Sequence, residues 1–183
     1  MDTPDTPAPI PTEGAATLVT RDGVVVEVRP VQASDEPVLA ALFEHVSPAD
    51  LRFRFLSGMR HVDHARIADM VHVDYVRTIT FIAFDQAGEP LATAMLAADA
   101  ALKTAEVAIS VRSDRKGQGI GWTLLQHVMA YGKARGFESI SSLESRQNRE
   151  TIAVERDAGF KFKSCEDDPA DVVATKSLVE PAR

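Results

Sequence analysis

The glycine-rich segment Lys116–Gly121 constrains the fold more than any other part of this sequence. Glycines alternate at positions 117, 119 and 121, after a strand-like run over Thr104–Val111 and before a helical apolar stripe that begins at Ile120. Glycine lets a backbone turn sharply and approach a ligand closely. A helix that starts directly after such a turn presents free N–H groups and a positive dipole end. The segment therefore predicts a strand–loop–helix unit that can hold an anion.

Two well-known phosphate-binding templates do not fit this loop. The dinucleotide fingerprint G-x-G-x-x-G fails from either starting glycine, because Trp122 and Leu124 stand where the third glycine is required. The P-loop template fails because no Lys-Ser or Lys-Thr pair follows a suitable glycine. A tight turn alone usually needs one or two glycines. Three glycines beside Arg112, Arg115 and Lys116 favour an anion cradle over that alternative.

The order of apolar patterns along the chain predicts an α+β fold. We expect a mixed, mostly antiparallel sheet flanked by helices, with one parallel crossover where the glycine loop lies. The expected strands cover residues 17–19, 24–31, 78–85, 91–98, 104–111, 139–143, 160–164 and 171–179. The expected helices run from a cap at Ser34 or Asp35 to about 45, from 48 onward after Ser47 as N-cap, over 64–71, from 120 to about 136 and over 148–158.

Length and composition favour one domain. The chain has 183 residues, enough for a single sizeable core. Residues 1–16 hold four of the ten prolines and predict a disordered arm, so we place the domain at 17–179 and a tail at 180–183. The single Cys165 excludes an internal disulfide. Since the N-terminus is acidic and no apolar run reaches membrane length, we expect no secretory signal, no membrane span and a cytoplasmic location.

The net charge of −7 comes almost entirely from the two ends. Residues 1–16 and 166–183 each carry a net −3, which leaves −1 for the segment between them. A nearly neutral domain without a basic face is not expected to bind nucleic acid. The acidic excess is therefore no argument against a phosphate-bearing ligand at the loop.

Two motifs resemble one enzyme family. Val111–Gly121 followed by Leu124-Leu125 resembles the acetyl-CoA loop of the GNAT N-acetyltransferases, whose pattern is R/Q-x-x-G-x-G/A. Lys116 stands at the first position of that pattern, a mild departure. The family's Asn-x₁₀-Gly-Phe is present as Asn148 and Gly159-Phe160. Over residues 24–179 the resemblance implies the GNAT acyltransferase fold, with the loop between the fourth strand and the following helix, and acetyl-CoA as co-substrate.

A narrower resemblance concerns the acceptor. The segments 18–23, 28–30 and 47–55 are similar to the bacterial protein lysine acetyltransferase group, and so is Thr104–Ala108. That group uses the glutamate corresponding to Glu106 as catalytic base. The resemblance implies a lysine-bearing protein as the acceptor partner. Members of the group often carry fused modules, for which this chain has no room.

The family resemblance also implies cofactor contacts. The pantetheine arm is expected to pair with the backbone near Val111 and Ser113, and the Val111 N–H to polarise the thioester carbonyl. The pyrophosphate is expected at the helix N-terminus. Asn148 can cap the following helix, touch the cofactor or do both. The expected cofactor residues are Val111, Ser113, Arg115, Lys116, Gly117, Gln118, Gly119, Ile120, Gly121 and Asn148.

One departure concerns the leaving group. Many family members place a tyrosine seven residues after the asparagine as general acid, and Glu155 stands there in this chain. A thiolate with a pKa near 8.5 can leave unassisted. The lysine-acetylating group also lacks this tyrosine.

Several alternatives stay open. A small-molecule amine acetyltransferase would use the same machinery, and an acyl-CoA-binding regulatory domain would use only the cofactor site. His61, His64 and His72 lack a recognised metal-ligand spacing, so we expect no metal. The sequence does not indicate an oligomeric state.

Overall fold

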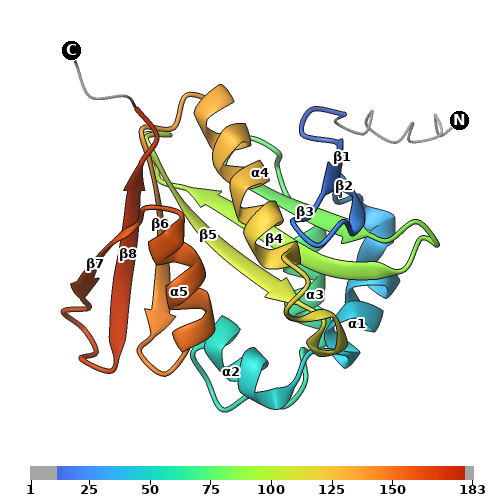
Figure 1. The fold of residues 1–183 in the computed structure, drawn as a ribbon, viewed down its shortest axis with the longest axis horizontal. Coiled ribbons are helices and arrows are strands. Elements are labelled where there is room, and N and C mark those ends of the chain that lie inside the picture. Colours follow the sequence, from blue (N-terminus) through green and yellow to red (C-terminus); the bar gives the residue numbers. More distant parts are fainter. Residues whose placement is uncertain (1–11, 180–183) are drawn as a thin grey trace, which may run out of the picture.

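The computed structural model describes residues 12–179, which form one mixed sheet with helices on both faces (Figure 1). The strand order in the sheet is β1-β2-β3-β4-β5-β6-β8-β7. All neighbouring pairs are antiparallel except β5 and β6, which are parallel. The strands are β1 (Ala16–Val19), β2 (Val25–Pro30), β3 (Thr78–Phe84), β4 (Pro90–Ala98), β5 (Thr104–Val111), β6 (Ser139–Ser145), β7 (Lys161–Ser164) and β8 (Asp171–Ser177).

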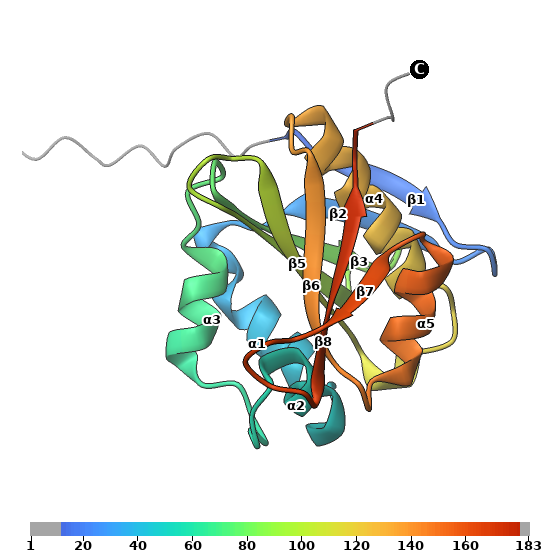
Figure 2. The ribbon, with the colours of Figure 1, turned by 90° about the vertical axis from the view of Figure 1, so that its left-hand side faces the viewer.

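The helices cover the two faces of the sheet unequally. In the turned view, α1, α2 and α3 lie on one side and α4 and α5 on the other (Figure 2). Because both faces are covered, five consecutive β3 residues from Ile79 to Ala83 are buried instead of alternating. The helices are α1 (Glu36–Glu44), α2 (Pro48–Phe55), α3 (His64–Val71), α4 (Ile120–Ala134) and α5 (Arg149–Asp157), with short 3₁₀ turns at Ala33–Asp35 and Ser113–Arg115.

This architecture confirms the predicted fold class. Every expected strand and helix is present within a few residues of its predicted bounds. Ser47 caps α2 as expected, since its side chain accepts a hydrogen bond from the Asp50 N–H. The glycine loop follows β5, which is the fourth strand counted from β2, because β1 forms only a short hairpin with β2.

The expected disordered arm lies mostly outside the described residues, which begin at Thr12. Its last residues are part of the folded domain. A turn joins Thr12 to Ala15, and Ala16 already belongs to β1. The Gly14 carbonyl lies 2.7 Å from the Nε2 of His127 on α4, so the ordered chain extends beyond the predicted start at 17.

The parallel pair β5–β6 is paired over a short distance. Its register runs from Thr104↔Ser139 to Glu106↔Ser141, and the two strands then diverge toward their C-terminal ends (Figure 1). Beyond that point β5 continues against β4, up to Ala92↔Val111, and β6 continues against β8. The sheet is therefore open between β5 and β6 beside the glycine loop.

A buried ion pair fixes the entry to the helical layer. Asp35 was expected as a possible helix cap, but its carboxylate instead accepts two hydrogen bonds from Arg29 on β2, at 2.6 and 2.8 Å. The Gln32 N–H also donates to it, at 2.7 Å. Burial opposes ionisation of Asp35, but these hydrogen bonds outweigh it and hold the pKa of this carboxyl below its ordinary value.

We expect Asp35→Asn to lower the free energy of unfolding by about 2 kcal/mol, because it leaves Arg29 without its charge partner. The contribution of Asp35 is fully present above pH about 4, where the unfolded carboxyl is ionised, and is lost as the pH falls through the lower folded pKa. Urea unfolding at several pH values measures both effects. Asp69→Asn, at an exposed carboxylate of α3, is the matched control, and an equal effect there would contradict the assignment.

Candidate active site

The open edge of β5 supplies backbone donors. The Arg112 N–H bonds to the Leu91 carbonyl of β4, at 2.9 Å. Because successive N–H groups of a strand point to opposite edges, the Val111 N–H points toward the β6 side. Within residues 12–179, the pairing of β5 with β6 ends at Glu106, so no strand of the sheet uses that donor. It is available to an extended ligand or to a carbonyl oxygen.

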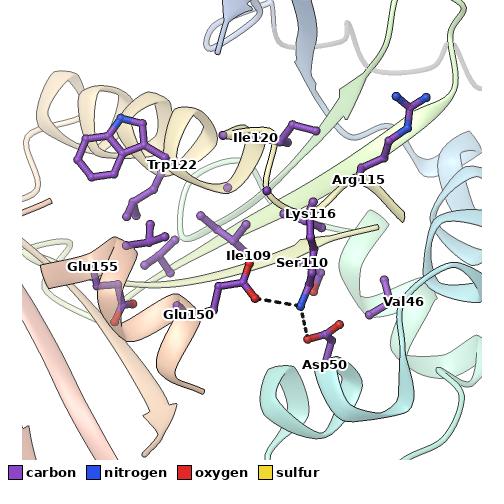
Figure 3. A pocket seen from close by; sticks show the side chains of 18 residues that line it. Val46, Asp50, Ile109, Ser110, Arg115, Lys116, Ile120, Trp122, Glu150 and Glu155 are labelled. Atoms are coloured by element: carbon purple, nitrogen blue, oxygen red, sulfur yellow. Dashed lines mark hydrogen bonds and ion pairs between the residues drawn. The ribbon is translucent and has the colours of Figure 1, made fainter. Parts of the chain in front are cut away.

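A pocket of about 210 Å³ lies along this part of β5 (Figure 3). It is formed by the end of β5, the glycine loop, the first turns of α4, one face of α5 and the neighbourhood of α2. Its lining residues are Val46, Asp50, Val107, Ile109, Ser110, Val111, Arg115, Lys116, Gly117, Gly119, Ile120, Gly121, Trp122, Leu125, Glu150, Thr151, Val154 and Glu155.

The loop is shaped as the sequence predicts for an anion cradle. Gly117 and Gly119 have φ values of 76° and 77°, which favour glycine, and Gly119 is the N-cap of α4. In the described part of the chain no side chain caps this helix. The N–H groups of its first turn are thus open to a ligand. Gly119 also packs on the β1–β2 turn, since an added Cβ would lie 3.3 Å from the Cβ of Thr20.

The three basic residues near the loop are paired with carboxylates. The Nζ of Lys116 lies 2.6 Å from Asp50 on α2 and 3.5 Å from Glu150 on α5 (Figure 3). Arg112 pairs with Asp114 at 2.9 Å, and Arg115 lies 3.3 Å from Asp85. The basic stretch seen in the sequence is therefore locally neutralised. The backbone N–H groups at the start of α4 are the donors left open.

Asp50 ties α2 to the loop. Its carboxylate accepts from the Ser47 hydroxyl at 2.7 Å and from the Ser113 hydroxyl at 3.3 Å, in addition to Lys116. Burial works against ionisation of Asp50, but the hydrogen bonds from Lys116 and the two serines outweigh it and lower the pKa of this carboxyl. This network holds α2 at the mouth of the pocket.

A second pocket, of about 270 Å³, opens on the α2 side of the strands. Glu106, exposed on β5, lines it. Asp50, Val107 and Thr151 line both pockets, so the two meet beside Glu106. The lining residues of this second pocket are Asp50, Phe53, Arg54, Phe55, Leu56, Glu106, Val107, Ala108, Leu143, Glu144, Asn148 and Thr151.

Buried charged groups gather where the pockets meet. Burial lowers the pKa of Arg54, whereas the charges of Glu106 and Glu144 raise it. Burial, and then the charge of Glu155, raise the pKa of Glu144 to about 8. Burial also raises the pKa of Glu155 to about 7, although a hydrogen bond from Ser142 works in the opposite direction. These carboxyls can hold or release a proton near neutral pH.

The predicted site residues divide between the two pockets. Val111, Arg115, Lys116 and the loop residues Gly117, Gly119, Ile120 and Gly121 line the first. Gln118 and Ser113 lie outside this lining; the Ser113 N–H bonds to the His45 carbonyl, and its hydroxyl accepts from the Ser47 N–H.

Asn148 lies beside Glu106 in the second pocket. Its side-chain oxygen accepts from the Thr151 N–H at 3.4 Å, which confirms the capping role, and its Nδ2 donates to Glu144 at 3.1 Å. A contact of Asn148 with the cofactor stays a prediction.

Several of the pocket residues carry no signal in the sequence that predicts their place at the site. Asp50, Arg54, Glu144 and Trp122 are brought to the site by packing between elements that are distant along the chain. The Arg21 guanidinium from the β1–β2 turn lies 4.5 Å from the centre of the Trp122 ring and adds a cation beside α4.

Two buried polar atoms support the fit of a polar ligand in the first pocket. The Ser110 hydroxyl and the Oε2 of Glu155 are buried there, without a hydrogen-bond partner in the described part of the chain. Buried polar groups are usually hydrogen-bonded, so unmatched ones in a pocket point to a ligand. Residues 12–179 contain no group of three His, Cys, Asp or Glu side chains arranged for a metal. No helix of the same range is long and apolar enough to span a membrane.

Known proteins with the same features are acetyltransferases. A model of the acetyltransferase (GNAT) family matches residues 45–160. Acetyltransferase PA5475 of Pseudomonas aeruginosa is 26% identical over 160 residues, which cover 86% of each chain. The GNAT domain of S. lividans PAT superposes with a TM-score of 0.84 at 27% identity, over 91% of this chain and 98% of that one.

A further solved structure that shares the fold is RimL, a ribosomal L7/L12 alpha-N-protein acetyltransferase in complex with coenzyme A. Its TM-score is 0.69 at 19% identity, over 92% of this chain and 97% of that one. The open strand pair and the anion cradle together define a coenzyme A-dependent acyltransferase. The chain belongs to the GNAT acetyltransferase family, and acetyl-CoA is its co-substrate.

Gly121→Ala separates ligand binding from folding. A Cβ at this position would meet Val111 Cγ2 at 3.6 Å, an ordinary contact, so we expect the melting temperature to stay within about 2 °C of wild type. The added methyl group enters the pocket wall, and we expect the Kd for acetyl-CoA to rise at least about tenfold. Calorimetric titration measures this Kd. Gly58→Ala, outside both pocket linings, is the control; a similar weakening there, or none at Gly121, would contradict the assignment.

Proposed function

We propose that this enzyme acetylates lysine side chains of a protein substrate, with Glu106 as the general base. The observation that carries the proposal is the meeting of two pockets at Glu106. One contains the glycine loop of the acetyl-CoA site, and the other opens on the α2 side and is lined by Glu106 itself. Donor and acceptor can therefore approach one carboxylate from opposite sides.

The lining of the second pocket suits a lysine side chain. Phe53, Phe55 and Leu56 offer apolar contact to an aliphatic stem. Leu56 ends α2 in a left-handed conformation and is 38% exposed, so an apolar residue stands where an incoming chain would enter. Glu106 attracts the ammonium group at the inner end.

Proton removal is the step that requires a base. A lysine amine with a pKa near 10.4 is roughly 0.1% neutral at pH 7.5, and only the neutral form attacks a thioester. Glu106 accepts that proton, directly or through water. The nitrogen then attacks the acetyl carbon while the Val111 N–H stabilises the developing charge on the carbonyl oxygen.

Glu106→Gln tests the base. The amide keeps the size of the side chain but cannot accept the proton, so we expect kcat to fall at least about 100-fold while the Kd for acetyl-CoA changes less than about twofold. Release of coenzyme A measures turnover, and calorimetry measures binding. Glu166→Gln, in an exposed loop, provides a matched control. Unchanged turnover in the Glu106 variant would exclude this base.

The acceptor is tested separately. Wild-type enzyme is offered purified lysine-bearing proteins and a panel of small amines, each with acetyl-CoA, and the products are identified by mass spectrometry. We expect kcat/KM for a protein lysine to exceed that of every small amine by at least about tenfold, because a protein can also contact the α2 surface around the pocket. The reverse order would assign a small-molecule amine as the acceptor.

A further inference from the structure

Glu155 is a buried carboxyl in the wall of the acetyl-CoA pocket. It projects from α5 and is only 3% exposed. It shares the pocket lining with Val111, whose N–H is open, and with the glycine loop (Figure 3). One of its oxygens accepts a hydrogen bond from the Ser142 hydroxyl. The other, Oε2, is buried and has no partner within residues 12–179.

We propose that Glu155 donates the proton that the coenzyme A thiolate needs as it leaves. The inference deepens the proposed function and rests on it, because it concerns the second half of the same transfer. It stands on the position of Glu155: a buried carboxyl at the cofactor pocket, held by Ser142 on one side and unpartnered on the other.

The surroundings of Glu155 keep a proton on it. Burial raises its pKa to about 7, so roughly half of the molecules carry the proton at neutral pH. The charge of Glu155 in turn raises the pKa of Glu144 on β6. Beyond Glu144 lie Arg54 of α2, which favours its ionisation, and Asp171 of β8, which opposes it.

Four further charged groups line the same pocket, namely Asp50, Arg115, Lys116 and Glu150. Lys116 is paired with Asp50 and Glu150, and Arg115 is paired with Asp85. None of the four forms a hydrogen bond or an ion pair with Glu155 in the described part of the chain. The pKa of Glu155 is therefore governed by burial, which raises it, and by the hydrogen bond from Ser142, which lowers it.

The transfer balances without another reactant. The amine nitrogen, having lost a proton to Glu106, forms the C–N bond to the acetyl carbon. The C–S bond then breaks, and its electron pair goes to sulfur. The Oε2–H of Glu155 passes its proton to that sulfur and leaves a carboxylate. As the amide forms, its nitrogen gives up its second proton to water. Water also takes the proton held by Glu106 and returns one to Glu155, so the products are the amide, the coenzyme A thiol and one released proton.

The direction of this proton transfer is favourable. A free thiol has a pKa near 8.5, higher than that of Glu155, so the proton moves to the stronger base. Glu106 serves the opposite purpose. It is exposed in the second pocket and meets the acceptor, whereas Glu155 is buried in the first.

Glu155→Gln is the principal variant, because the amide keeps the bond to Ser142 and removes the acidic proton. We expect kcat to fall at least about tenfold with less than a twofold change in the Kd for acetyl-CoA. The loss is expected to be largest near pH 6 and to shrink toward pH 9, because the wild type itself loses the Glu155 proton over that range. A loss that merely reflects packing would not vary with pH in this way.

Asp157→Asn is the matched control, because it makes the same change at an exposed position of α5 outside both pocket linings. It is expected to keep the wild-type kcat at every pH. An unchanged kcat in Glu155→Gln, or a loss that is constant with pH, would overturn the proposal. Thermal unfolding of both variants shows whether they are folded.

Infrared spectroscopy tests the proton directly, without an acceptor. We expect the wild type to show carbonyl bands of protonated carboxyl groups that titrate between about pH 6 and 9, since Glu155 and Glu144 both have strongly raised pKa values. We expect Glu155→Gln to lose part of these bands, and bands that the substitution leaves unchanged would overturn the proposal. If the wild type acetylates no amine at all, the proposed function fails, while this comparison still decides whether Glu155 holds a proton.

Discussion

The short pairing of β5 with β6 is the constraint on which the rest of the site depends. Three residues on each strand are in register, and then each strand follows a different antiparallel neighbour. A longer parallel pairing would close the sheet, occupy the Val111 N–H and leave no room beside the glycine loop. The opening also brings α2 and α5 near the same point from opposite faces. The two pockets are thus two sides of one interruption in the sheet.

The charges around this opening are arranged so that few cations stay free. Lys116 joins α2 and α5 through Asp50 and Glu150, so its charge also holds the mouth of the pocket together. An ion pair of lysine and aspartate at the protein surface usually contributes little to stability. The Lys116–Asp50 pair is stronger, because it is partly buried and Asp50 accepts several hydrogen bonds. The main-chain donors and the α4 dipole are then the chief attraction for an anion at the loop. Salt and nearby acidic side chains weaken this attraction less than they would weaken that of an unpaired lysine.

Sequence reasoning succeeded where the signal is local. The glycine loop, the Ser47 cap, the Asn148 cap and the order of strands each follow from residues close together in the chain. It failed where contacts between distant segments determine the role of a side chain. Asp35 is predicted as a helix cap, yet its carboxylate accepts hydrogen bonds from Arg29 on strand β2. The basic residues at the loop have no acidic partner that the local sequence indicates, but Lys116 pairs with Asp50, which is distant along the chain. No pattern in the sequence shows that Glu144 and Glu155 interact, since strand β6 must first pack beneath helix α5.

Glutamates at three positions around one opening illustrate how environment assigns chemistry to identical side chains. Glu106 stands in contact with solvent at the end of the paired stretch and lines the second pocket. Glu155 is enclosed beside the cofactor loop, where the neutral form is favoured. Glu144 accepts a hydrogen bond from Asn148, and burial together with the charge of Glu155 raises its pKa to about 8. In the mechanism that we propose, separate carboxyls take the proton from the acceptor and give a proton to the leaving group, because the open strands divide one site into an exposed and a buried half.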